Sequence, residues 1–331
     1  MKRLAWRPAV VLAAAAISVA AAQPVPRAGT LVGTLRLSPR ESALLAARGG
    51  RLYAVVTTGR ALHFTIMRAA DGAVTRTRVP FALSNYLANV SAGPDGIYAG
   101  TAVIHRLRDV PDELVRIDPR TLRVVARASF GASIGTIELG RSMWAALGDG
   151  RVARLDPRSL RVLRSQRVLP TAAVSAGSRL STPTVGAGSL WVLAGSTPRL
   201  ELVRIEPSTL AIRSRTPLAT HGIRAGTVHS VVARGSSVYL VGSVVVRVGA
   251  NGRLGRPAAV PGLETAQVDG STLVGLLGAR PALVRLDSRG HVVRRTALRD
   301  ASAQLTLSGR DAWFLGNGGR GNGIVHARLG R

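Results

Sequence analysis

A segment that repeats along the chain constrains the fold more than any other feature of the sequence. Residues 114–122 read LVRIDPRTL, and similar segments follow at 152–160 (VARLDPRSL), 202–210 (LVRIEPSTL) and, more loosely, 283–290 (LVRLDSRG). Each joins an alternating apolar strand to a four-residue turn, in which proline presets φ and short polar side chains stabilise the bend. A strand and turn that recur at intervals of about 45 residues are typical of the blades of a β-propeller.

A second repeated feature gives the number of blades. A Gly or Ser, then one or two residues, then a large apolar residue and an apolar stretch occur at seven anchor positions: Tyr53, Tyr98, Trp144, Trp191, Tyr239, Val274 and Trp313. Large side chains at equivalent places in twisted sheets fill the space between neighbouring blades. We therefore expect the anchors to be buried, each opening the second strand of a blade, with the strand before it lining the central channel.

The two ends of the chain predict how the ring closes. The unit of Trp313 has a third strand near residues 323–329, and the sequence then stops without a fourth. Residues 30–37 (TLVGTLRL) precede the first complete unit and have strand character. An N-terminal strand that completes the C-terminal blade removes the free edges of an open array. The sequence thus predicts an all-β chain with a single seven-bladed β-propeller closed in this way.

The first 22 residues form a separate segment. Lys2, Arg3 and Arg7 make a basic region, residues 9–22 make an apolar run of about fourteen residues, and small residues precede Gln23, as in a secretory signal peptide. The run is short for a membrane span, which needs about 20 residues; an uncleaved anchor is the alternative. We expect a signal peptide at 1–22, a propeller at 23–331, no transmembrane span in the mature chain, and a secreted or periplasmic location.

Composition excludes some chemistry and leaves one question open. The chain has no cysteine, which excludes disulfides, cysteine-ligated metals and thiol nucleophiles. The net charge is +28, and Lys2 is the only lysine, so arginine carries almost all of it. Either this excess makes a surface for anionic polymers, or it reflects a GC-rich genome. Basic and acidic residues alternate and aromatic residues outside the repeat are scarce, so we expect no specific nucleic-acid binding.

The repeat also resembles a known family. Residues 189–193 (SLWVL), 202–207 (LVRIEP) and 92–98 (AGPDGIY) are similar to YVTN/NHL-type propeller repeats, including the streptogramin-lyase-like branch. The resemblance implies a propeller along the mature chain, and the family includes lyases, sensors and adhesive modules. The pairs that mark WD repeats are absent, as is the blade motif of quinoprotein dehydrogenases, and we expect no cofactor.

Five side chains are candidates for a site at one mouth of the channel. All belong to segments that cross from the outer strand of one blade to the inner strand of the next: His221, His229, Glu264, Asp300 and Glu41. By repeat alignment they lie on consecutive blades, in the order five, six, seven and one, with both histidines on blade five. Carboxylates and imidazoles together can act as general acid and base or ligate a cation. The other possibility is that they are unrelated solvated residues, as we expect for His63, His291 and His326 on outer strands or turns.

The leading interpretation is an exported, non-catalytic propeller that presents a binding face to a protein, a small molecule or a glycan, and acts as a monomer. One alternative is a lyase or hydrolase of the streptogramin-lyase type, with His and Glu at the channel mouth. The other is an anionic-polymer binder that uses its surface arginines. The fold alone does not decide between them.

Overall fold

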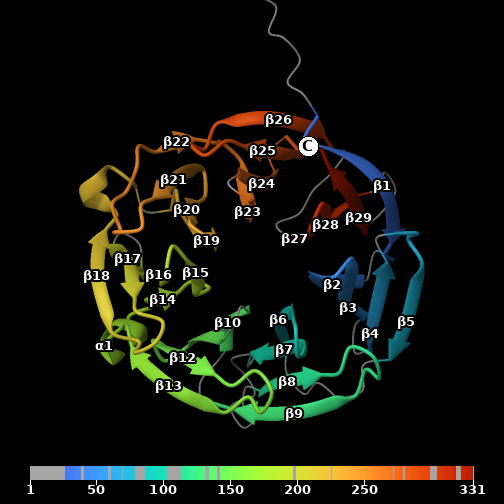
Figure 1. The fold of residues 1–331 in the computed structure, drawn as a ribbon, viewed down its shortest axis with the longest axis horizontal. Coiled ribbons are helices and arrows are strands. Elements are labelled where there is room, and N and C mark those ends of the chain that lie inside the picture. Colours follow the sequence, from blue (N-terminus) through green and yellow to red (C-terminus); the bar gives the residue numbers. More distant parts are fainter. Residues whose placement is uncertain are drawn as a thin grey trace, which may run out of the picture.

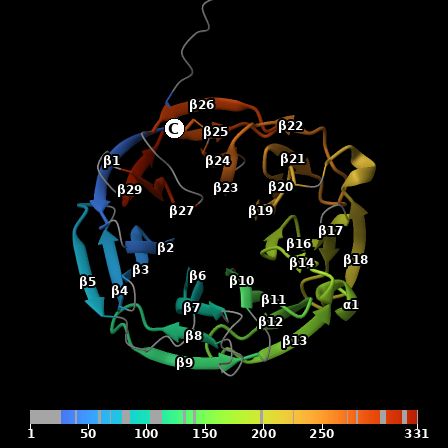
Figure 2. The same ribbon diagram turned by 180° about the vertical axis from the view of Figure 1, so that it is seen from behind.

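In the computed structural model, the described residues form seven antiparallel sheets arranged around a central axis (Figure 1). The described residues are 27–330, except 39–40, 59–60, 69, 79–85, 103–112, 131–133, 140–141, 197–198, 225, 271, 279, 299–303 and 318–321. Seen from behind, the first strand of each blade lies toward the axis and the last strand forms the rim (Figure 2). The predicted seven-bladed propeller is confirmed.

The strands follow the order of the chain within each blade. Blade 1 contains β2 (Glu41–Arg48), β3 (Arg51–Thr58), β4 (Ala61–Arg68) and β5 (Val74–Arg78). Blade 2 contains β6 (Tyr86–Gly93), β7 (Gly96–Ala102), β8 (Glu113–Ile117) and β9 (Val124–Ser129). Blade 3 contains β10 (Ile134–Leu139), β11 (Met143–Leu147), β12 (Arg151–Leu155) and β13 (Val162–Arg167). Blade 4 contains β14 (Arg179–Leu180), β15 (Thr184–Gly186), β16 (Ser189–Ser196), β17 (Arg199–Ile205) and β18 (Ile212–Pro217).

Blades 5 and 6 have the same strand order, and blade 7 takes its fourth strand from the N-terminal part of the chain. Blade 5 contains β19 (Ser230–Arg234), β20 (Ser237–Val241), β21 (Val244–Val248) and β22 (Ala258–Ala259). Blade 6 contains β23 (Leu263–Asp269), β24 (Thr272–Leu277), β25 (Ala282–Leu286) and β26 (Val292–Ala297). Blade 7 contains β27 (Leu305–Ser308), β28 (Asp311–Asn317), β29 (Asn322–Leu329) and β1 (Gly29–Arg36). The described helices are α1 (Thr171–Ser175) and the 3₁₀ turn η1 (Ala219–His221), and none is long and apolar enough to cross a membrane.

The N-terminal strand closes the ring. β1 pairs antiparallel with β29, from Gly29 opposite Leu329 to Arg36 opposite Gly323, with a bulge between Leu31 and Gly33. The predicted completion of the last blade by the N-terminal strand is therefore confirmed. Because β1 covers the edge of β29, that edge is not left open to pair with another chain.

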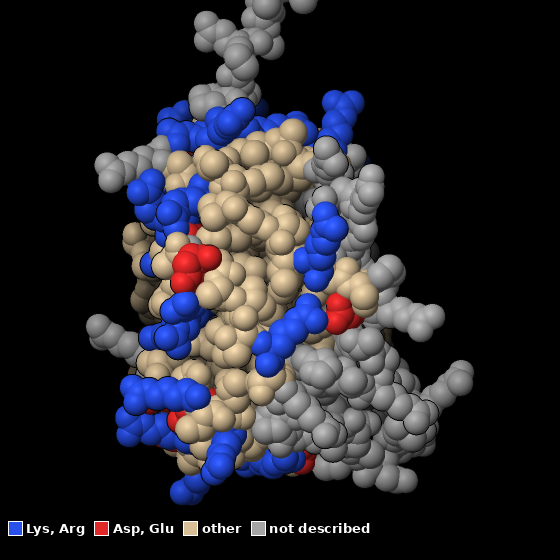
Figure 3. All heavy atoms as spheres, turned by 90° about the vertical axis from the view of Figure 1, so that its right-hand side faces the viewer, with Lys and Arg blue, Asp and Glu red and all other residues tan. Residues whose placement is uncertain are grey.

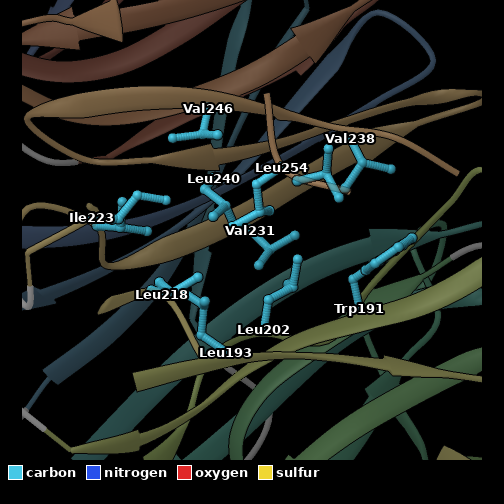
Figure 4. Close-up of a cluster of buried hydrophobic side chains, with 12 residues drawn as sticks. Trp191, Leu193, Leu202, Leu218, Ile223, Val231, Val238, Leu240, Val246 and Leu254 are labelled. Carbon is cyan, nitrogen blue, oxygen red and sulfur yellow. The ribbon is translucent and has the colours of Figure 1, made fainter. Parts of the chain in front are cut away.

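The seven anchors are buried, at most 6% exposed, as the repeat predicted. They join neighbouring blades: Trp191 of blade 4 belongs to a cluster with Leu202 of its own blade and Val231, Val238 and Leu240 of blade 5 (Figure 4). Burial of this apolar area between blades is the main stabilising contribution, at about 25 cal/mol per Å².

An arginine lies opposite the anchor on the third strand of five blades. These cross-strand pairs are Tyr98–Arg116, Trp144–Arg154, Trp191–Arg204, Tyr239–Arg247 and Val274–Arg285. The guanidinium carbons of Arg154 and Arg204 lie 5.7 Å from the ring centroids of Trp144 and Trp191, which is within cation–π range. The Nε of Arg204 also donates to Ser189 Oγ at 2.8 Å. Part of the arginine excess therefore serves the packing of the blades.

Blades 7 and 1 depart from this arginine rule. Opposite Trp313 in blade 7 stands His326, whose ring stacks on the indole at 4.9 Å and whose Nε2 donates to Asp311 Oδ1 at 2.9 Å. His326 is 1% exposed, so the prediction that it is solvated was wrong, because β1 covers β29 and makes it an interior strand. Opposite Tyr53 in blade 1 stands Ile66, which carries no charge.

Candidate functional site

Two of the predicted site residues meet on one face of the ring. We call this the crossover face; it carries the connections between blades, among them residues 168–178, 218–224 and 260–262. The Nε2 of His229, just before the inner strand of blade 5, lies 2.9 Å from the backbone oxygen of Glu264 at the start of blade 6. Because a carbonyl oxygen only accepts, Nε2 carries a proton and Nδ1 is the remaining nitrogen of the ring.

A β-bulge explains why this carbonyl reaches His229. The register of β23 against β24 shifts between Leu263 and Thr265, so Glu264 is the extra residue and takes no place in the ladder. A bulge of this kind redirects a residue out of the sheet. The Glu264 residue is exposed, and its carboxylate lies against the backbone of Gly278, where an added Cβ would overlap it. His229 therefore contacts the main chain of Glu264, while the carboxylate faces elsewhere on the same surface.

The other histidine of blade 5, His221, is close to His229 in sequence but does not share its contacts. His221 ends η1, followed by Gly222 at φ 70°, a left-handed position that suits glycine. It is exposed, and within the described residues no hydrogen bond or ion pair joins its side chain to His229 or Glu264. Asp300 lies outside the described residues.

Glu41 is engaged within its own loop. Its Oε2 accepts a hydrogen bond from the backbone N–H of Ser38 at 2.6 Å, and its own N–H donates to the Ser38 carbonyl at 2.9 Å. Its Oε1 lies 3.7 Å from a guanidinium nitrogen of Arg76, and the side chain is 12% exposed. Both carboxylate oxygens therefore have internal partners at the start of β2.

These contacts bear on what the crossover face can do chemically. In the described part of the chain, no three His, Asp or Glu side chains are placed to hold a metal ion. The face thus offers an exposed imidazole at His221, a second imidazole with one nitrogen engaged at His229, and an exposed carboxylate at Glu264. This set suits hydrogen bonding to a polar ligand or partner.

The carboxylates with lowered pKa lie on the opposite surface. We call it the hairpin face; it carries the turns that join the first strand to the second and the third strand to the fourth, such as residues 49–50, 93–96, 118–121 and 156–159. Backbone hydrogen bonds from Thr121 and Arg120 lower the pKa of Asp118, and bonds from Ser159 lower that of Asp156. These aspartates stabilise turns, which accounts for their recurrence in the repeat.

The surface arginines are partly paired. The described ion pairs include Arg127–Glu113, Arg151–Asp149, Arg158–Asp95, Arg213–Glu206 and Arg215–Glu201. On the side of the ring in Figure 3, the right-hand side of Figure 1, the described arginine side chains form separate groups around an uncharged area, with acidic residues among them. On that side the described residues form no continuous basic stripe, the pattern that an anionic polymer would need.

Sequence reasoning missed two hollows at the seams between blades. One, of about 330 Å³, lies between blades 1 and 2 and is lined by Arg48, Arg51 and Tyr53 among others. The other, of about 340 Å³, lies between blades 7 and 1 and is lined in part by His326. Aligning the third strands could have pointed to both, because Ile66 and His326 stand where blades 2 to 6 have arginine.

Comparison with known proteins shows the fold alone. The sequence matches no protein-family model and no curated protein. It is similar in structure to BamB from Moraxella catarrhalis, with a TM-score of 0.58 and 15% identity over 90% of this chain and 99% of that one. A chain of the mitotic checkpoint complex gives a TM-score of 0.68 and 12% identity over 100% of this chain and 99% of that one. The molecule is therefore a β-propeller repeat protein of seven blades.

Proposed function

We propose that the chain is an exported, non-catalytic β-propeller whose crossover face binds a partner protein or a polar ligand such as a glycan. The observation that carries the proposal is the contact between His229 and Glu264, which brings polar groups of two adjacent blades together on a closed, rigid ring. His221 is exposed on the same face. A rigid scaffold that presents exposed polar side chains suits recognition, because little ordering entropy is lost on binding.

The contacts favour binding over catalysis. A catalytic site needs a preorganised set of titrating groups around a reacting atom. Glu41 has both carboxylate oxygens engaged by Ser38 and Arg76, and His229 has Nε2 engaged by a carbonyl. We infer that His221, Glu264 and the free nitrogen of His229 contact the ligand.

The export part of the proposal rests on residues 1–22, a basic start followed by an apolar run and small residues before Gln23. It is consistent with a chain that has no cysteine and needs no redox protection. We further propose that the mature chain is a monomer of the YVTN/NHL type. Mass spectrometry of the protein from the cell envelope or medium should give Gln23 as its first residue; an intact residue 1 would contradict cleavage.

Site-specific photo-crosslinking in the producing cells tests the binding face. A photoreactive residue replaces His221 on the crossover face, and a matched one replaces Arg289, an exposed residue in a turn of the hairpin face. We expect a discrete adduct from position 221 that is absent from position 289 and that disappears in the Glu264→Gln background. Equal adducts from both positions, or none from position 221, would refute the proposal.

A further inference from the structure

The hairpin of blade 1 places two arginines side by side. Arg48 and Arg51 are the last cross-strand pair of β2 and β3, joined by Gly49 and Gly50 at φ 55° and 69°. Such a two-glycine turn keeps the pair in close register. Like charges directly opposite on a sheet are unfavourable. Both residues are exposed, and neither has an ion-pair or hydrogen-bond partner for its side chain within the described residues.

The acids of the neighbouring hairpins are already engaged. Asp95, in the turn between β6 and β7, lies 3.2 Å from Arg158, with its Oδ1 accepting from Nε. Asp311, at the start of β28, accepts from buried His326 and lies 3.5 Å from Arg328. The positive charge at the tip of the first hairpin is therefore not neutralised by these nearby carboxylates.

A hollow opens next to this pair. Its volume of about 330 Å³ is lined by Arg48, Arg51 and Tyr53 of blade 1 and by Pro94 and Pro119 of blade 2. It lies at the small end of the range for ligand pockets. Among the described residues no carboxylate lines it, and the charged groups that line it are the two guanidinium groups.

The anchors of blades 1 and 2 differ in the contacts of their hydroxyl groups. In blade 2 the anchor Tyr98 donates its hydroxyl to Pro157 O of blade 3 at 2.9 Å, and burial raises its pKa to about 12, so it stays protonated. In blade 1 the equivalent pair, Tyr53 and Pro119, lines the hollow, and within the described residues the Tyr53 hydroxyl has no partner. The residue opposite Tyr53 is Ile66, so blade 1 has no arginine to lie over its anchor.

We infer that this hollow binds a small aromatic oxyanion, with a carboxylate or phosphate between Arg48 and Arg51 and a planar body against Tyr53, Pro94 and Pro119. Guanidinium groups match such oxygens in paired hydrogen bonds, and the bound anion relieves the repulsion between the two arginines. The Tyr53 hydroxyl supplies a further donor. The site lies on the hairpin face, opposite the surface of the proposed function, and its test is independent of that proposal.

Isothermal titration of the full chain with benzoate and with phenyl phosphate tests the site, at about 0.15 M ionic strength to screen diffuse charge. We expect saturable binding of at least one probe at a single site, and the preferred probe identifies the oxyanion as carboxylate or phosphate. Acetate, which has no ring, should bind at least about tenfold more weakly than benzoate. Acetate binding as tightly as benzoate would overturn the aromatic part of the inference.

A charge-matched pair of variants separates the site from the general basicity of the chain. Arg48→Gln with Arg51→Gln should weaken binding by about tenfold or more, because charge-assisted hydrogen bonds are lost. Arg253→Gln with Arg256→Gln removes the same charge from exposed positions of blade 5 and should leave binding within about twofold. Equal weakening by both pairs, or no binding of either probe at about 10 mM, would overturn the site.

Two further measurements exclude a merely structural role. Tyr53→Phe keeps the ring that packs in the core and removes only the hydroxyl, so it should weaken binding by about fivefold without loss of folding. Because Arg48 and Arg51 repel each other, Arg48→Gln should keep or raise the melting temperature of the free chain. A lowered melting temperature with unchanged binding would assign the pair to structure alone.

Discussion

Trp191 allows a direct test of how neighbouring blades are held together. It is fully buried, its Nε1 donates to Gly186 O at 2.8 Å, and the Arg204 guanidinium lies 5.7 Å from its ring. Its six-membered ring also approaches Gly252 in a turn of blade 5, where an added Cβ would be 3.9 Å from the indole. Trp191→Ala removes all of these contacts at once.

The expected magnitude follows from these contacts. Truncation of a buried tryptophan to alanine costs about 3–5 kcal/mol in transfer and cavity terms. The buried carbonyl of Gly186 loses its donor, which adds about 1 kcal/mol, and Arg204 loses a cation–π contact worth about 0.5–1 kcal/mol. We expect the free energy of unfolding to fall by about 4.5–7 kcal/mol, a large share of the 5–15 kcal/mol of a typical domain. Trp191→Phe keeps a ring and should cost about half as much.

Guanidinium unfolding followed by far-UV circular dichroism measures this loss without relying on tryptophan fluorescence. Leu163→Ala is the matched control, because Leu163 is 58% exposed on the rim and its truncation should cost less than about 0.5 kcal/mol. A loss below about 1 kcal/mol for Trp191→Ala, or one no larger than that of the control, would refute the account of anchors as interblade wedges.

Three further predictions concern the closure, the blade 7 histidine and the turns. Deletion of residues 27–36 removes β1, and amide exchange in β29 should then accelerate at least about tenfold; unchanged exchange would contradict closure by β1. His326→Ala leaves Asp311 without its buried donor and should lower the free energy of unfolding by about 3 kcal/mol. His326→Arg introduces the residue that blades 2 to 6 have at this place and should cost less. A larger loss for His326→Arg than for His326→Ala would show that position 326 is not equivalent to the arginine positions of blades 2 to 6. The pKa of Asp156 is lowered in the folded chain, so ionised Asp156 contributes fully to folding stability above its ordinary pKa of 3.8, and this contribution is lost as the pH falls through the folded pKa. Asp156→Asn should therefore flatten the decline in melting temperature between about pH 4 and pH 2. An unchanged decline would count against a stabilising role for the ionised side chain.

The repeat made most of the fold predictable. The seven anchors predict the number of blades, because each large apolar side chain must be buried between two blades. The incomplete last unit predicts the pairing of β1 with β29, because an unpaired strand edge must be covered. The turns were also predictable, but Leu122, Leu160 and Leu210 follow them at φ 55°, 63° and 61°. That conformation costs about 1–2 kcal/mol in a non-glycine residue. Leu160 and Leu210 are fully buried, so tertiary packing offsets a local cost that the sequence pattern does not reveal.

The candidate site was less predictable, for a physical reason. Repeat alignment places a residue on a face of the ring, but it does not say which partner its side chain finds. Glu41 was placed on the correct connection, yet the adjacent Ser38 N–H and the distant Arg76 both reach its carboxylate. His229 and Glu264 are brought together, but through a backbone carbonyl that a bulge exposes, and single-residue shifts of this kind are not visible in an alignment of strands.

Departures from the repeat are therefore more informative than residue type. In blades 2 to 6 an arginine opposite the anchor forms part of the packing, so the abundance of arginine by itself says little about ligands. Where the rule changes, at Ile66 in blade 1 and His326 in blade 7, a hollow lies at the adjoining seam. These two blades are neighbours at the closure of the ring, where β1 replaces a strand that the repeat supplies elsewhere. His326 itself lines the hollow at blade 7, and Tyr53, the anchor opposite Ile66, lines the hollow at blade 1. Packing between blades makes the same demand on every blade, so ligand binding gives the simplest physical reason for the different residues at these two seams.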